Sequence, residues 1–139
     1  MKAVSLFGNI PARKKFMKSV QTELRHCLNI VEQFALAHPR VQFTLSHGKK
    51  TLAFFPPAEQ NLERIEQVMG SGITSFYIPV EGSDHYLTIH GFIAKPQMHT
   101  RTQQKQYLFV NARIVTDKLI ATAVKESFGT MLESNTFPI

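Results

Sequence analysis

Four basic side chains follow a proline near the start of the chain, and their chemistry is that of phosphate binding. They are Arg13, Lys14, Lys15 and Lys18, and they come within one helical span of Pro11. Proline is accepted in the first turn of a helix because its missing N–H has no partner there. Asn9 or Ile10 is therefore predicted to begin a helix, although positive charge at that end opposes the helix dipole. The cluster indicates either an anionic partner or a solvated charged face.

Patterns for catalysis and for metal binding are absent from the sequence. No two of the six histidines take the i, i+4 spacing of a zinc-binding helix. There is no phosphate-binding P-loop, dinucleotide fingerprint or nucleophile elbow. Asp117 and Glu126 stand too far apart on one predicted helix to act as a carboxylate pair. Binding or coupling is therefore a better interpretation than catalysis, and we expect neither a catalytic residue nor a cofactor or metal in this chain.

The net charge of the 139-residue chain is +6, and a basic domain is a candidate for nucleic-acid binding. Residues 1–50 hold nine Lys or Arg against two Asp or Glu, so the positive charge belongs mainly to that part. The length predicts a single domain with a substantial core. The lone cysteine, Cys27, excludes an internal disulfide and fits a reducing cytoplasm, and we expect it to be buried and inert. No apolar run is long enough to span a membrane.

Apolar spacing and breaker residues predict an α+β or α/β fold, with one mixed β-sheet backed by long helices on one face. Residues 3–7 are predicted to end a strand, and Ser19 to cap a helix that runs to about Ala37. The apolar face of that helix includes Val20, Cys27 and Phe34. Residues 41–46 and 51–55 are predicted to form a hairpin, and residues 61–69 a helix that ends at Gly70.

The second half of the chain is predicted to hold strands at residues 75–80, 86–95 and 106–111. The last of these should be central and buried on both faces, because nearly all its residues are apolar. Residues 96–104 are expected to form a mobile surface loop. Thr116 is predicted to cap a final helix that runs to about Glu133, and residues 137–139 to open another strand.

Several motifs together resemble those of one protein family. Residues 6–16, Leu-Phe-Gly-Asn-Ile-Pro-Ala-Arg-Lys-Lys-Phe, resemble the family's L-F-x-N-x-P-A-R-x-K-F segment. Residues 107–113, Tyr-Leu-Phe-Val-Asn-Ala-Arg, followed by Asp-Lys-Leu-Ile at 117–120, resemble its V-N-G-R-x-x-x-D-[RK]-L segment. These segments resemble the MutL family of DNA mismatch-repair ATPases, and the resemblance covers essentially the whole chain. Gly8 departs from a usual aromatic residue, and Ala112 stands where Gly or Asn often follows V-N, in a turn that can require positive φ.

The resemblance implies that residues 1–139 are a single transducer domain from the middle of a longer MutL-type protein, with the fold of domain 2 of ribosomal protein S5 but without its last strand and helix. The family's ATP and Mg²⁺ bind to an N-terminal ATPase domain of the gyrase–Hsp90–kinase–MutL type, whose motifs this sequence lacks. It also stops before the H-P-A-K segment that carries a γ-phosphate lysine. The fragment is therefore expected not to hydrolyse ATP. The parent protein would be a cytoplasmic DNA-dependent ATPase that forms a homodimer and meets a MutS-type mismatch sensor, with no membrane partner.

The resemblance also implies a DNA-binding role for Lys118 in the D-[RK]-L segment, with Arg113 just upstream. Non-specific contact with the DNA backbone needs charge rather than the bidentate fork of arginine, so lysine can serve. Arg13, Lys14, Lys15 and Lys18 could extend that surface, or could face the ATPase domain. Asn9, Pro11 and Asn111 are read as interdomain or structural residues, and Arg113 could equally make a surface ion pair.

Two rival functions remain open on the sequence. One is a stand-alone S5-like module that binds DNA or RNA without an ATPase partner. The other is the transducer domain of a different gyrase- or Hsp90-type ATPase, against which the N-x-P-A-R segment argues. An exposed sheet edge could also let two copies of the fragment pair.

Overall fold

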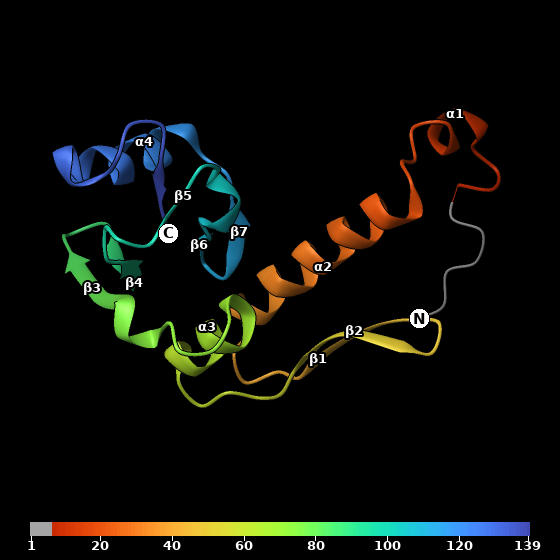
Figure 1. Ribbon diagram of the computed structural model, residues 1–139, viewed down its shortest axis with the longest axis horizontal. Coiled ribbons are helices and arrows are strands. Elements are labelled where there is room, and N and C mark those ends of the chain that lie inside the picture. The colour runs from red at the N-terminus through yellow and green to blue at the C-terminus, as the bar shows by residue number, and fades with distance from the viewer. Residues whose placement is uncertain (1–6) are drawn as a thin grey trace.

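The computed structural model describes residues 7–139, and their helices and two-stranded antiparallel pairings give an α+β fold (Figure 1). A short helix α1 (Pro11–Lys14) precedes the long helix α2 (Val20–Ala37). A hairpin of β1 (Phe43–His47) and β2 (Lys50–Phe55) runs beside α2 and leads to α3 (Asn61–Met69). The remaining elements gather beyond α3, at the other end of the long axis from α1.

The first predicted strand lies almost wholly outside the described residues. Its last residue, Phe7, is in a turn with φ of 61°, and its carbonyl accepts a hydrogen bond from the N–H of Ile10. Ile10, one of the two residues predicted to begin this helix, is the N-cap of α1 without a side-chain hydrogen bond, and Pro11 is in the first turn. Because α1 has a single turn, Arg13 and Lys14 also belong to its last turn, where the dipole favours cations. The predicted conflict with the helix dipole is therefore wrong.

Local signals place α2 and the hairpin correctly. Ser19 caps α2, and its hydroxyl accepts a hydrogen bond from the N–H of Thr22. The next acid, Glu23, accepts the N–H of Lys18 at 2.8 Å, so the helix start has two side-chain acceptors. Gly48 adopts a positive φ of 61° in the two-residue turn between β1 and β2. The register shifts after Leu45, which marks a β-bulge.

Helix α3 matches its predicted bounds and carries the one large charged side chain of the described residues that is fully buried. Arg64 is 1% exposed, and its Nη2 donates to the carbonyl oxygens of Pro39 at 2.5 Å and Val41 at 2.7 Å. Burial lowers the pKa of Arg64 from its usual range. Arg64 thus ties α3 to the segment between α2 and β1, while the N–H of Ala58 donates to Pro39 on the same segment.

The strands pair in a pattern that differs from one mixed sheet. In the described part of the chain every pairing is antiparallel, in four separate two-stranded units. After the 3₁₀ turn η1 (Thr74–Phe76), β3 (Tyr77–Ser83) pairs with β4 (Thr88–Ala94). The strand β5 (His99–Thr100) pairs with β8 (Phe137–Pro138), and β6 (Leu108–Val110) with β7 (Arg113–Val115).

The strand predicted at 106–111 is present in part, as β6, but its predicted central and buried position is wrong. β6 has β7 as its sole neighbour among the described strands, and Val110 is 51% exposed. The segment 96–104, predicted as an irregular loop, contains β5 and the start of a 3₁₀ turn, η2 (Gln103–Lys105). A run of apolar residues is therefore not sufficient evidence of burial here, because burial depends on which elements cover it.

The last helix is shorter than predicted. α4 spans Lys118–Ser127 and is capped by Asp117, not Thr116, and the 3₁₀ turn η3 (Gly129–Met131) follows it. Both residues favour caps, and the Asp117 carboxylate takes the role by accepting the N–H of Ile120 at 3.0 Å. Of the apolar residues in and just after α4, Phe128 is buried, but Leu119 and Met131 are 81% and 62% exposed.

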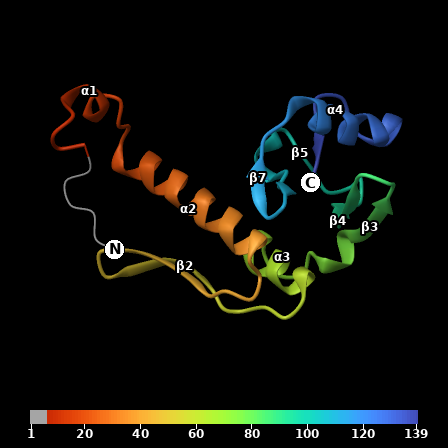
Figure 2. The same ribbon diagram turned by 180° about the vertical axis from the view of Figure 1, so that it is seen from behind.

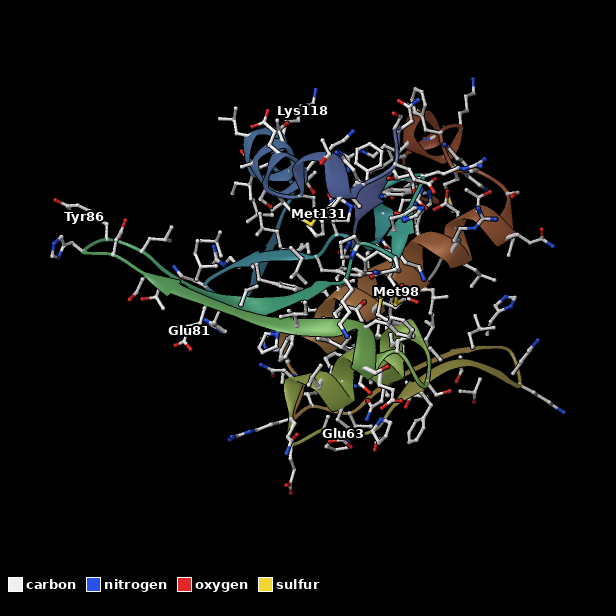
Figure 3. The ribbon with its side chains drawn as sticks, turned by 60° about the vertical axis from the view of Figure 1, so that its left-hand side comes forward. Glu63, Glu81, Tyr86, Met98, Lys118 and Met131 are labelled. Carbon is white, nitrogen blue, oxygen red and sulfur yellow. The ribbon has the colours of Figure 1, made fainter. Side chains whose placement is uncertain are left out.

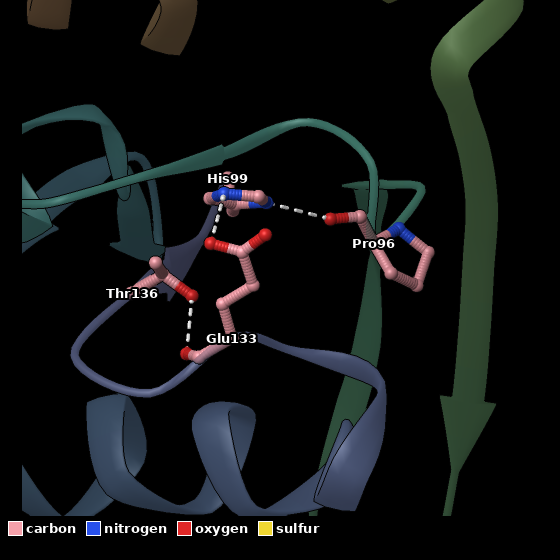
Figure 4. A network of polar contacts seen from close by, with 4 residues as sticks. All are labelled: Pro96, His99, Glu133 and Thr136. Atoms are coloured by element: carbon pink, nitrogen blue, oxygen red, sulfur yellow. Dashed lines mark hydrogen bonds and ion pairs between the residues drawn. The ribbon is translucent and has the colours of Figure 1, made fainter.

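The C-terminal strand predicted at 137–139 is present and is held by a small polar network (Figure 4). His99 Nδ1 donates to the carbonyl of Pro96 at 3.0 Å, and its Nε2 lies 3.8 Å from Glu133 Oε2. The hydroxyl of Thr136 donates to the backbone carbonyl of Glu133 at 2.7 Å. Beyond this network the carbonyl of Ile139 accepts the N–H of Ala94. These bonds fix the end of the chain against β4 and β5.

The substantial core expected from the length is not observed. The chain exposes 11114 Å² of surface, whereas a compact monomer of 15.8 kDa would expose about 7,300 Å². Among residues 7–139, the buried hydrophobic residues are Ala35, Phe55, Ala58, Ala94 and Phe128. On α2, Val20 and Phe34 are 65% and 55% exposed, and Cys27 is exposed rather than buried. The apolar residues of α2 follow the predicted helical spacing, but other elements cover only part of that face.

Candidate nucleic-acid interface

The tight turn between β6 and β7 presents the first predicted DNA-binding residue. Asn111 and Ala112 form the turn, and both have positive φ, 49° and 61°. Two positive φ values in a two-residue hairpin loop define a type I′ turn, which matches the right-handed twist of the strands. Arg113 follows at once and is exposed, beside a shallow depression that Val110, Asn111 and Val115 also line. Asn111 thus has a backbone role as a turn residue.

Lys118 was predicted to bind DNA together with Arg113, and it is the first residue of α4. Its side chain is exposed and points away from the body of the molecule (Figure 3). A cation at a helix N-terminus is locally unfavourable. The neighbouring Asp117 carboxylate offsets that cost because it caps the helix by accepting the N–H of Ile120. The structure therefore places an arginine and a lysine on adjoining segments, where both can reach a polyanion.

The other predicted group, Arg13, Lys14, Lys15 and Lys18, surrounds α1, and all four side chains are exposed. The Arg13 guanidinium lies 6.0 Å from the centre of the Phe7 ring, a cation–π distance. Asn9 is exposed in the turn before α1. The four basic residues thus project from a short, well-exposed part of the chain.

The structure does not bring the two predicted groups together. α1 and α4 lie at opposite ends of the long axis, with the length of α2 between them (Figure 1). The six residues proposed from the sequence therefore form two surfaces rather than one. Residues that are close in sequence within each group are also close in space, but nothing in the sequence indicates how far apart the two groups lie.

Neither group is neutralised by carboxylates. Within residues 7–139, the single ion-pair contact joins His99 and Glu133, so no lysine or arginine there has a carboxylate partner within 4.0 Å. Unneutralised cations on exposed segments are suited to phosphate, and their binding would weaken steeply with salt. In the same part of the chain no cluster of three metal-ligating side chains occurs, and no helix is long and apolar enough to cross a bilayer.

Sequence reasoning missed that Glu32 on α2 and Tyr107, in the segment before β6, are half-buried and close enough to affect each other's pKa. Burial raises the pKa of Glu32, although Lys105 and the hydroxyl of Tyr107 oppose the rise. Burial, with the nearby Glu32 and Tyr77, raises the pKa of Tyr107 to about 12. Tyr107 was expected to be buried because it lies in the apolar run 106–111. No sequence pattern connects it with Glu32, which is 75 positions away.

Comparisons with known proteins find similarity to DNA mismatch repair proteins over nearly the whole chain. Residues 65–139 match the family model described as "DNA mismatch repair protein, C-terminal domain". The DNA mismatch repair protein MutL of Neisseria gonorrhoeae is 38% identical over 138 residues, which are 99% of this chain and 21% of that protein. MutL of Chlorobaculum tepidum is 33% identical over 134 residues, which are 96% of this chain and 21% of that protein.

Solved structures show the same likeness. The Aquifex aeolicus MutL ATPase domain complexed with ADP superposes with a TM-score of 0.67 at 27% identity, over 88% of this chain and 45% of that chain. The N-terminal domain of a DNA repair protein gives a TM-score of 0.71 at 19% identity, over 95% of this chain and 45% of that chain, and shows the fold alone. These matches are consistent with the expected S5-like α+β fold.

The chain spans about a fifth of the length of the curated relatives that it matches. The family model covers more than half of the chain, and the similarity to the relatives extends over nearly all of it. The chain belongs to the DNA mismatch repair protein MutL family.

Proposed function

We propose that this chain is the transducer part of a MutL-type ATPase and that it binds the DNA backbone through Lys118 and Arg113. In the whole protein it would couple ATP-driven closure of the N-terminal domains to DNA binding, in a cytoplasmic homodimer that works with a MutS-type mismatch sensor. The chain itself would not hydrolyse ATP. Its likeness to part of a MutL ATPase domain structure supports a place within such an ATPase.

The observation that carries the DNA role is the setting of Lys118. Its ammonium group projects from the first residue of α4 with no carboxylate within ion-pair distance, although a cation at that position costs helix stability. Arg113 adds a second cation on the adjoining strand β7. Point charges of this kind contact phosphates without reading bases, so binding should be nearly independent of sequence and sensitive to salt.

The test is fluorescence anisotropy of a labelled duplex with the chain over a series of salt concentrations. Lys118→Glu should weaken binding and make the slope of log K against log salt shallower by about 1, because roughly one phosphate contact is lost. Lys118→Arg keeps the charge and should keep both affinity and slope. Arg40→Glu makes the same change of charge on the exposed loop after α2 and serves as the control. Equal affinities for wild type and Lys118→Glu at every salt concentration would reject the proposal.

A further inference from the structure

β3 and β4 form a hairpin that extends away from the rest of the molecule. Figures 1 and 2 show it at the end of the long axis opposite α1, and Figure 3 shows Tyr86 at its tip. Among the described strands, β3 and β4 pair only with each other. Each strand therefore has a second edge, and an edge with unpaired N–H and carbonyl groups is a template for another strand. The two edges of this hairpin differ in whether they can serve as one.

The register of the hairpin fixes which backbone groups face outwards. The N–H of Asp84 donates to the carbonyl of Leu87 at 2.9 Å, and the N–H of Lys95 donates to the carbonyl of Phe76 at 2.8 Å. In an antiparallel pair, residues whose backbone groups face the partner strand alternate with residues whose groups face away. The outward groups therefore belong to the odd-numbered residues of β3 and to the even-numbered residues of β4.

The outer edge of β3 is closed, whereas that of β4 is open. Pro79, one of the outward residues of β3, has no N–H to donate. On β4 the outward N–H of Ala94 donates to the carbonyl of Ile139 at 2.8 Å, so this edge already accepts one group from beyond the hairpin. In the described part of the chain no backbone hydrogen bond beyond the hairpin involves the other outward positions of β4. These three open positions are Thr88, His90 and Phe92.

The open positions of β4 are complementary to those of a second copy of the chain. When two β4 strands run antiparallel about a two-fold axis at His90, Thr88 lies opposite Phe92 of the second copy, and His90 lies opposite its own equivalent. This register pairs all three open positions. It also places Ile89, which is 56% exposed, opposite Gly91 of the second copy. No atom lies within 4 Å of the point that a Cβ on Gly91 would occupy, so the isoleucine side chain has space there.

The chemistry of the hairpin also favours this pairing. Ile78, Val80 and Ile89 share one face of the hairpin and are 45%, 38% and 56% exposed, so the single chain leaves that face open to water. β4 contains no Asp, Glu, Lys or Arg, and such charges are a usual means of blocking a strand edge. The chain exposes 11114 Å², against about 7,300 Å² for a compact monomer of its mass, so its surplus surface exceeds the roughly 1,600 Å² of a standard interface.

We infer that this chain forms a dimer in which the β4 strands of two copies pair edge to edge, with the two-fold axis at His90. The two hairpins then make one four-stranded antiparallel sheet. A strand of another protein is the rival occupant of this edge. The second copy is favoured because its own open positions match in number and spacing, and because its Gly91 accommodates Ile89. The inference is independent of the proposed DNA site, since neither Lys118 nor Arg113 is in the hairpin.

The experiment measures association by sedimentation velocity over a series of chain concentrations, with a reductant present because Cys27 is exposed. Wild type should show a dimer whose fraction rises with concentration. His90→Pro removes an outward N–H from each copy and no bond within the hairpin, so it should raise the dissociation constant by about tenfold or more. Glu81→Pro makes the matched change directly across the hairpin, on the edge that Pro79 already closes, and should dimerise like wild type. Circular dichroism checks that both variants fold.

A charge exchange tests the register without proline. His90→Lys and His90→Glu each place like charges opposite one another across the axis, so each should dimerise more weakly than the parent chain. Their equimolar mixture should recover a dimer, because opposite charges then face each other. Both variants carry Glu81→Gln, because Glu81 lies across the hairpin from residue 90.

Three results would overturn the inference. One is a wild-type chain that sediments as a monomer at every concentration, which would leave the edge to a strand of another protein. The second is a His90→Pro dimer as stable as the Glu81→Pro dimer. The third is a mixture that associates no better than its two components, because the strands are then not paired at His90. None of these results alters the anisotropy test of Lys118, so the proposed function stands or fails separately.

Discussion

Ala112 is the residue whose replacement should stabilise the chain. It occupies the second position of the β6–β7 turn with φ of 61°, in the left-handed region. For an L-residue with a Cβ this region costs about 1–2 kcal/mol, and glycine enters it freely. Asn111, at φ of 49°, is less strained because short polar side chains tolerate this conformation.

The gain from Ala112→Gly is smaller than the relieved strain. Glycine also gives the unfolded chain more freedom, which costs about 0.4–1 kcal/mol in the opposite direction. The difference leaves a net stabilisation of roughly 0.5–1 kcal/mol. For a domain of this size the melting temperature should rise by about 2–4 °C. In urea the midpoint should rise with an unchanged m value, because the surface exposed on unfolding stays the same.

Ala123→Gly provides the matched control. Ala123 is exposed within α4, where the backbone is helical and glycine should cost about 1 kcal/mol. The same substitution should therefore stabilise at one position and destabilise at the other. If Ala112→Gly lowers the urea midpoint as Ala123→Gly does, residue 112 does not hold a positive φ in solution, and the type I′ assignment of this turn is wrong.

Three further substitutions test packing, capping and burial. Arg64→Ala should lower the free energy of unfolding by about 2–4 kcal/mol, because it removes the buried donor to the backbone carbonyls of Pro39 and Val41 and leaves a cavity. A loss under about 0.5 kcal/mol in urea would show that the contact is not formed. Asp117→Ala should cost about 1 kcal/mol and reduce helical circular dichroism, whereas Asp117→Asn should keep most of the cap. The folded state keeps the proton of Tyr107 up to a pKa of about 12, while the unfolded chain loses it near 10.0, so stability should fall as pH rises through that interval. Tyr107→Phe should remove this part of the alkaline decline in urea titrations, and an identical decline in both proteins would disprove the assignment.

Elements with local signals could be predicted from the sequence. Ser19 caps α2 because its hydroxyl accepts a backbone N–H of the first turn. Gly48 forms the hairpin turn and Gly70 ends α3 because glycine adopts a positive φ without a steric cost. Asp117, not Thr116, caps α4. Both residue types favour the cap position, so the sequence alone does not decide between two adjacent candidates. The backbone geometry decides.

Burial and the grouping of the site were harder to predict. Val110 and Cys27 are apolar in pattern yet exposed, because the elements that would cover them are set by tertiary contacts. For the candidate site, the exposure of Lys118 and Lys14 follows from charge alone. Their separation to opposite ends depends on the direction of α2, and no residue spacing encodes that direction.

The uneven cover along α2 has a consequence for its dynamics. Ala35, near its C-terminal end, is fully buried, whereas Val20, at the start, is 65% exposed beyond the Ser19 cap. Amide protons exchange with solvent through local opening, which costs least where few tertiary contacts must break. Protection should therefore rise from the first turns towards the last, with the helix fraying from the end that carries α1. A ligand that ordered this end would slow exchange in the first turns of α2 before it changed the last.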